Sequence, residues 1–120
     1  MENHKAVRPE HLNHHGFLFG GYLLQWVDEQ AWIAASLDYP GCDFVTVGLD
    51  KVEFKKSVRQ GTILQFVARR ARRGRTSVTY RIRVFRGDHK ADRRPIFSTH
   101  VTLVCIDPDG RKQPLPGRRG

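Results

Sequence analysis

The longest regular pattern of apolar residues in this chain has the period of a helix. Residues 22–37 contain no Gly or Pro, and small or apolar residues recur three or four positions apart: Leu24, Val27, Ala31, Ala34 and Ala35. Gly20-Gly21 precedes this stretch, and a Pro-Gly pair follows it at 40–41. The pattern predicts one long helix that ends just beyond Asp38. The polar face of this helix is a narrow wedge of three residues: Gln25, Glu29 and Ser36. We therefore expect the helix to be enclosed on several sides, with only this polar wedge facing water.

Asp28 is the exception to this pattern. It is a charged residue at the border of the apolar stripe, outside the polar wedge. A carboxylate in such a position must be hydrogen-bonded, hydrated or protonated. Two interpretations follow. Asp28 either faces a water-lined groove or caps a neighbouring segment, or it is a catalytic carboxylate held near the start of the helix.

The rest of the chain has the patterns of β-strands. Residues 77–86 alternate regularly between apolar and polar side chains, and 62–70 are apolar on both faces. Segments 44–58 and 96–106 are two further strand candidates, and 5–9 is a short extended segment expected at a sheet edge.

Turn signals divide these strands. In segment 44–58 the apolar residues occupy odd positions before Asp50-Lys51 and even positions after it. Such a change of face predicts a bulge or a sharp bend at that point. Residues 72–75 read as a hairpin turn, 107–110 as the turn that ends the sheet, and 111–120 as a disordered tail of a single domain spanning 1–120. One long helix followed by antiparallel strands predicts an α+β fold whose sheet wraps over the helix. The few strands leave an unprotected edge, so we expect pairing with a second copy.

Gly20-Gly21 predicts an anion-binding position at the start of the helix. The first backbone N–H groups of a helix have no intrahelical acceptor, and the helix dipole adds positive potential there. A carbonyl oxygen that develops negative charge would be stabilised at such a position. Together with a carboxylate two turns along the helix, this arrangement suits acyl transfer.

These residues carry a resemblance to a known family. The pattern Asn13-x-x-Gly16-x-x-Phe19-Gly20-Gly21, followed by Trp26-x-Asp28, resembles the hot-dog-fold acyl-CoA thioesterases, in their bacterial and cytosolic acyl-CoA hydrolase branch. The likeness covers roughly 5–108 and continues through three further motifs: Val45-Thr46-Val47, Phe54-Lys55-Lys56-Ser57-Val58 and Gly74-Arg75-Thr76-Ser77. It implies a curved antiparallel sheet around one central helix, in homodimers or trimers of dimers. Two differences from the family are Lys56, where Pro is common, and a heavier arginine run at 69–73.

The resemblance also implies roles for single residues. Asp28 is the expected catalytic carboxylate, as a base toward water or as a direct nucleophile. The N–H of Gly21 is expected to bind the thioester oxygen, and Asn13 to reach across from the other subunit, although Asn13 also suits a structural turn. The resemblance also implies a set of residues at the acyl or thioester site: Gly16, Leu18, Phe19, Gly20, Leu24 and Trp32. Core packing explains the apolar side chains of this set equally well. No cofactor is expected, because coenzyme A is part of the substrate.

The net charge of +9 comes from one segment. Residues 69–94 hold 11 Lys and Arg against 2 Asp and Glu, while the remaining residues hold 10 of each sign. Such a block predicts an anionic partner or a strongly solvated surface. With the resemblance, the phosphates of coenzyme A account for part of this block through the turn that the family uses: Arg75, Thr76 and Ser77. The resemblance also places Lys55 and Lys56, which lie outside the block, near the nucleotide.

The cysteines, the N-terminus and the histidines bear on the compartment of the protein and on metal binding. The two cysteines, Cys42 and Cys105, suit reduced thiols of a cytoplasmic protein, and neither a signal peptide nor a membrane span is expected. His11, His14 and His15 cluster without a recognised metal-ligand spacing, so no metal is expected.

Two alternative functions remain open. His15 and Glu29 resemble the acid–base pair of a 3-hydroxyacyl dehydratase of the same fold, although that family's prolines before the helix are missing. Residues 69–86 would suit a basic nucleic-acid-binding module, but nucleic acid is not the expected partner, because the block lacks an organised aromatic platform.

Overall fold

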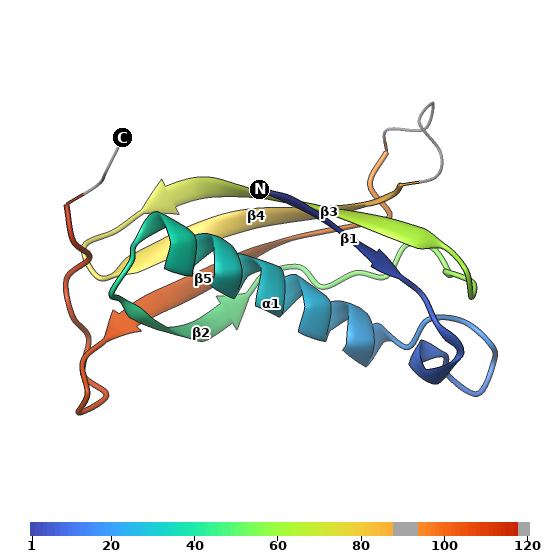
Figure 1. Ribbon diagram of the computed structural model, residues 1–120, viewed down its shortest axis with the longest axis horizontal. Helices are drawn as coiled ribbons and strands as arrows, with labels where there is room; N and C mark the ends of the chain where they lie inside the picture. The colour runs from blue at the N-terminus through green and yellow to red at the C-terminus, as the bar shows by residue number, and fades with distance from the viewer. Residues whose placement is uncertain (88–93, 118–120) are drawn as a thin grey trace.

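A five-stranded antiparallel sheet carries one long helix across a single face (Figure 1). The computed structural model describes residues 1–87 and 94–117. The sheet order is β1-β3-β4-β5-β2. In chain order the elements are β1 (Glu2–Ala6), the 3-10 turn η1 (Pro9–His11), α1 (Gly20–Asp38), β2 (Asp43–Leu49), β3 (Ile63–Arg73), β4 (Ser77–Arg86) and β5 (Phe97–Ile106). The expected α+β architecture, with a curved sheet and one central helix, is confirmed.

Helix α1 buries one side against the sheet. The buried residues form a stripe at helical spacing: Leu23, Trp26, Val27, Gln30, Ala31, Ala34 and Ala35. The opposite side is open in a single chain, where Trp32 is 48% exposed and Leu37 is 68% exposed. The expectation that several sides of the helix are enclosed is therefore wrong for one chain, because the sheet covers only one side.

A buried glutamine on this stripe was not anticipated from the pattern. The side chain of Gln30 lies on the sheet side of α1, where its Oε1 accepts a hydrogen bond from Asn3 Nδ2 at 2.7 Å. Strand β1 thus supplies the partner that makes burial of this amide tolerable. The sequence pattern does not contain this information, because Asn3 is 27 residues away.

Strand β4 has the predicted bounds, whereas β2 is shorter than expected. Strand β2 ends at Leu49, and residues 50–58 form a coil that has no regular secondary structure. The irregularity in β2 falls between Thr46 and Gly48, not at Asp50-Lys51. Lys51 does mark a sharp change of direction, with a φ of +37°. The switch of the apolar residues from odd to even positions at 50–51 therefore marks the end of the strand, and it is not a bulge within the strand.

Both ends of the chain are more ordered than expected. The extended segment predicted at 5–9 is displaced: strand β1 begins at Glu2 and ends at Ala6, and only its position at the sheet edge agrees with the prediction. Residues 111–117 pack against the end of the sheet: Leu115 is buried, and its N–H donates to the Arg75 carbonyl at 2.9 Å. The expected disordered tail is therefore wrong for 111–117, while 118–120 lie outside the described residues. Among the residues that are described, none of the helices is long and apolar enough to cross a membrane.

Candidate active site

The loop before α1 is shaped by Asn13. Its Oδ1 accepts hydrogen bonds from the backbone N–H of His15 at 2.9 Å and of Phe17 at 3.1 Å. Gly16 adopts a φ of +83° within this turn, a conformation that favours glycine. The structural role of Asn13 as a turn residue is thus real. Its Nδ2 group has no acceptor within the described residues and is available to a ligand or another chain.

The start of α1 presents two unpaired backbone donors. The N-cap residue Phe19 makes no side-chain cap, and its carbonyl accepts from the N–H of Tyr22 at 3.0 Å. The N–H groups of Gly20 and Gly21 have no acceptor in the part of the chain that the structure describes. Free amides at a helix N-terminus, where the dipole is positive, are the arrangement that stabilises an oxyanion.

Aromatic rings lie against both glycines, so a side chain at either position would require a ring to shift. A Cβ at Gly20 would lie 2.9 Å from Cζ of Phe54, and a Cβ at Gly21 would lie 2.5 Å from Cε2 of Phe19. The two rings therefore flank the unpaired amides. Both rings are partly exposed, at 52% for Phe19 and 51% for Phe54, so they border the amides with apolar surface and leave them accessible to a ligand.

Asp28 is held by a residue that the sequence analysis did not select. Thr46 Oγ1, on β2, donates a hydrogen bond to Asp28 Oδ1 at 2.5 Å. The second carboxylate oxygen, Oδ2, has no partner among the described residues, and Asp28 is half-buried. The sequence did contain a signal: Thr46 is the polar residue between two valines, so strand alternation puts it on the opposite face from them. Val45 and Val47 are exposed, while Thr46 faces the helix.

A cavity of about 720 Å³ opens beside the helix start. Its lining is mainly apolar, with two lysines at the rim: Asn13, His15, Phe17, Leu18, Phe19, Gly20, Leu23, Phe54, Lys55, Lys56, Ser57 and Val58. The cavity brings together six of the predicted site residues: Asn13, Leu18, Phe19, Gly20, Lys55 and Lys56. Its volume lies within the range of about 300–1,000 Å³ that is typical of small-molecule sites.

Other predicted site residues lie outside this cavity. Asp28 is eight residues beyond Gly20, about 12 Å along the helix axis, and neither Gly16 nor Leu24 lines the cavity. Arg75, Thr76 and Ser77 form the β3–β4 hairpin at the opposite end of the sheet, beside the C-terminus of α1 (Figure 1). A single chain therefore does not gather the predicted site in one place.

The arginine block is likewise spread over the sheet. Arg70 Nη1 donates to the hydroxyl of Tyr39 at 3.2 Å, and Arg73 Nη2 donates to the Pro116 carbonyl at 2.7 Å. The aromatic residues of the block are buried: Tyr80 is 1% exposed and Phe85 is 3% exposed. With its rings buried, segment 69–86 offers no surface for stacking nucleic-acid bases. Lys90 and Arg93 lie outside the described residues.

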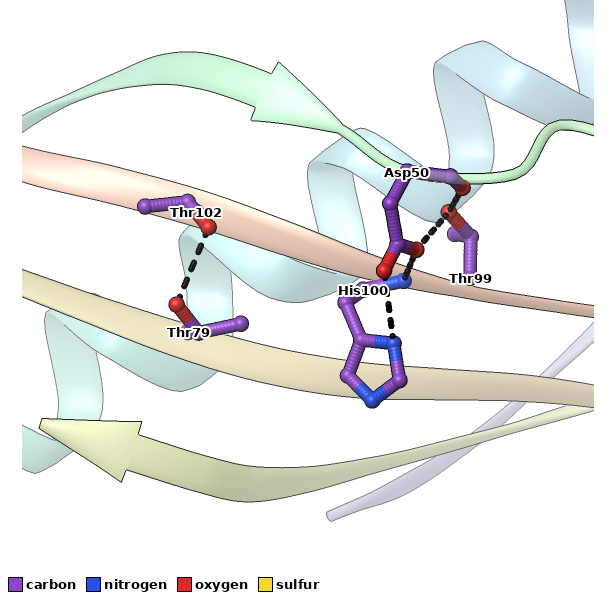
Figure 2. Close-up of polar contacts among 5 residues, drawn as sticks. All are labelled: Asp50, Thr79, Thr99, His100 and Thr102. Carbon is purple, nitrogen blue, oxygen red and sulfur yellow. Dashed lines mark hydrogen bonds and ion pairs between the residues drawn. The ribbon is translucent and has the colours of Figure 1, made fainter.

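The coil that carries Lys55 and Lys56 is anchored at Asp50 (Figure 2). The carboxylate of Asp50 accepts from the backbone N–H of His100 at 2.7 Å, and its Oδ2 lies 3.1 Å from Nδ1 of the same histidine. The Thr99 hydroxyl donates to the Asp50 carbonyl. The hydrogen bond from the His100 amide is the main reason that the pKa of Asp50 lies below its ordinary value.

The histidines and cysteines noted in the sequence do not form a further catalytic or metal site among the described residues. The ring of His11 packs edge-on against Trp26, with centroids 4.8 Å apart, and no cluster of three metal-binding side chains occurs among the described residues. Burial, together with the neighbouring Cys105 thiol, raises the pKa of Cys42 to about 12, so this thiol is a poor nucleophile. His15 lines the cavity but Glu29 does not, so they are not brought together there as an acid–base pair.

Comparison with known proteins identifies the family and the fold. The family model of the thioesterase superfamily matches residues 15–92. The hexameric thioesterase y2039 from Yersinia pestis is similar, at 29% identity and a TM-score of 0.86, with 96% of this chain and 93% of that chain covered. An acyl-CoA hydrolase from Staphylococcus aureus, solved with coenzyme A, is 30% identical with a TM-score of 0.86, over 98% of this chain and 70% of that chain.

The chain belongs to the thioesterase superfamily and has its hot-dog fold. Mouse acyl-coenzyme A thioesterase 11 is 28% identical over 97% of this chain. This chain spans only about a fifth of that relative's length, since 20% of it is covered.

Proposed function

We propose that the protein is an acyl-CoA thioesterase, which hydrolyses acyl-CoA to a free acid and coenzyme A. The observation that carries the proposal is the pair of unpaired N–H groups at Gly20 and Gly21, beside an apolar cavity with lysines at its rim. The amides suit the oxyanion of a thioester under attack, and the apolar lining suits an acyl group. The proposed reaction needs no metal or organic cofactor.

Asp28 is the proposed catalytic carboxylate, oriented by Thr46. In one route its free Oδ2 accepts a proton from water as that water attacks the carbonyl carbon; in the other, Oδ2 attacks directly. In both routes the C–S bond breaks and the thiolate of coenzyme A leaves and is protonated. In the direct route this step leaves the acyl group on Asp28 as an anhydride, and a water molecule then hydrolyses the anhydride to the free acid and restores the carboxylate. The S. aureus hydrolase supports these assignments, because alanine variants of an Asn, an Asp and a Thr were studied in it. Its Asn and Asp are 15 positions apart, as Asn13 and Asp28 are, and its Thr follows the Asp by 17 positions, compared with 18 here.

We propose that each active site is shared by two chains. Strand β2 lies at a sheet edge, and Asp28 faces it through Thr46. Antiparallel pairing of β2 with β2 of a second copy would reverse the direction of helix and strands across a two-fold axis. The loop of Asn13 in one chain would then approach Asp28 of the other, which a single chain does not achieve. The hexameric assembly of the Yersinia pestis thioesterase is consistent with dimers that assemble further.

The same two-fold arrangement would reunite the proposed coenzyme A site. Lys55 and Lys56 lie at the cavity, whereas Arg75, Thr76 and Ser77 lie at the far end of the same chain. Reversal of the partner would bring its hairpin to the end of the dimer that holds the first chain's cavity. Arg75 is exposed there and is free to contact a phosphate.

The decisive experiment measures the release of free coenzyme A from a panel of acyl-CoA substrates, from acetyl to palmitoyl. The wild type is expected to hydrolyse at least part of this panel, and Asp28→Asn to lose about 100-fold or more in kcat. A chelator should leave the rate unchanged. No release from any substrate would overturn the proposal.

A further inference from the structure

The coil of residues 50–58 separates two cavities. The cavity of about 720 Å³ lies between this coil and the loop before α1. A second cavity, of about 380 Å³, lies between the coil and the first residues of β5, with this lining: Asp50, Lys51, Glu53, Lys55, Pro95, Phe97, Ser98, Thr99 and His100. Lys55 lines both cavities, so the coil is the wall between them.

The ring of Phe54 extends from this coil between Phe97 and Gly20. It stacks on Phe97 with ring centroids 5.6 Å apart and an interplanar angle of 27°. On its other side it lies so close to Gly20 that a Cβ there would be 2.9 Å from its Cζ. Gly20 lines the larger cavity and Phe97 lines the smaller one. Phe54 therefore occupies the gap between them.

The backbone on both sides of Phe54 is anchored, so the ring has a defined place. At one end, the Asp50 N–H donates to the His100 carbonyl at 3.1 Å, and the Asp50 carboxylate accepts from the His100 N–H (Figure 2). At the other end, the N–H of Leu18 donates to the Val58 carbonyl at 2.7 Å, and Val58 is buried. Phe54 itself remains 51% exposed, so it is not an ordinary core residue.

We propose that Phe54 determines the length of acyl chain that the enzyme accepts; this inference rests on the proposed thioesterase function. A thioester carbonyl held by the amides of Gly20 and Gly21 would place the first carbons of the acyl group beside the ring that touches Gly20. The ring closes the larger cavity toward Phe97. A smaller side chain would join the two cavities and admit longer acyl groups, whereas an indole would shorten the larger cavity. Phe54 is thus a specificity-determining residue.

The test compares kcat/KM across the acetyl to palmitoyl panel for the wild type, Phe54→Ala, Phe54→Trp and Val52→Ala. Val52 is the matched control, because it lies on the same coil, is 41% exposed and lines neither cavity. The ratio of kcat/KM for long over short chains is expected to rise about tenfold or more in Phe54→Ala, since a single methylene group changes such ratios by roughly 10–200-fold. The ratio should fall in Phe54→Trp and stay unchanged in Val52→Ala.

The outcomes separate this inference from the proposed function. An active wild type whose chain-length profile is the same in Phe54→Ala and Phe54→Trp would overturn the role of Phe54 alone. A wild type that releases coenzyme A from no substrate would overturn the proposed function and this inference with it. If thermal unfolding shows that Phe54→Ala is not folded, Phe54→Leu replaces it, because leucine keeps an apolar contact while vacating part of the gap.

Discussion

Thr46 Oγ1 lies 2.5 Å from Asp28 Oδ1, and this hydrogen bond joins strand β2 to helix α1. It directs one carboxylate oxygen at the strand and leaves the other without a partner in the described chain. Because the bond involves an ionised acceptor, it is of the stronger kind. Thr46 therefore fixes the orientation of the proposed catalytic group.

Removing the Thr46 hydroxyl is expected to reduce catalysis more than binding. Thr46→Ala should lower kcat by about tenfold to a hundredfold, which is the cost of one hydrogen bond to a charged group. Thr46→Ser keeps the hydroxyl and should recover most of the activity. Steady-state kinetics check both variants. Equal losses in Thr46→Ser and Thr46→Ala would show that the methyl group matters and the hydrogen bond does not.

The unpaired amide of Gly21 should tolerate no side chain. In Gly21→Ala the new methyl group would lie 2.5 Å from Cε2 of Phe19, so the ring must move away from the amide that it borders. We expect kcat to fall by about tenfold or more, toward the loss of an oxyanion donor. Gly117→Ala is the control, because nothing lies within 4 Å of a Cβ at that position and Gly117 belongs to the C-terminal segment, outside β2 and α1. Kinetics and thermal unfolding of both variants test the prediction, and an unchanged kcat in Gly21→Ala would contradict it.

Subunit mixing tests the shared site. Asn13→Ala and Asp28→Ala are each expected to be nearly inactive alone. In a random mixture half of the dimers are mixed, and one of the two sites in each mixed dimer carries both wild-type residues. Activity should then recover to about a quarter of the wild-type value. If subunit exchange is confirmed and the mixture is no more active than its parents, both residues serve the same chain's site.

Arg75 is expected to contribute to binding and not to the chemical step. Arg75→Ala should raise KM at nearly constant kcat, because a contact to the nucleotide is made equally in the ground state and the transition state. A loss of roughly 1–3 kcal/mol is expected for one charge-assisted contact, and higher salt should weaken coenzyme A binding in the same direction. Arg69→Ala, which removes an equally exposed cation, is the control. A fall in kcat at constant KM would exclude the binding role.

The pKa of Asp50 predicts how stability depends on pH. This pKa is lowered in the folded chain, mainly by the hydrogen bond from the His100 amide. The stabilisation is therefore present above the ordinary value of 3.8 and is lost as the pH falls through the lower folded pKa. Asp50→Asn should have a lower Tm at neutral pH, and the difference should shrink in acid. Asp109→Asn, in an exposed turn, should show no such trend, and a parallel Tm difference at every pH would contradict the prediction.

The sequence by itself determined the elements and the position of the helix start. The 3.6-residue period over 22–37 and the alternation over 77–86 are local properties, so the helix and strand β4 were predicted close to their observed bounds. The two glycines, which are the first residues of α1, also identified the unpaired amides, because the first N–H groups of any helix have no intrahelical acceptor.

Only the tertiary structure decided which side chains meet. Thr46 and Asp28 are 18 residues apart, and their contact depends on how β2 crosses the helix. The burial of Gln30 beside Asn3 and the packing of Leu115 near Arg75 depend in the same way on distant segments. The separation of Arg75 from the cavity follows from a 19-residue helix and the long hairpin beside it, which hold the two ends of the sheet apart. Local periodicity sets the direction of a side chain relative to its own element, whereas the partner across the core is set by strand order and register.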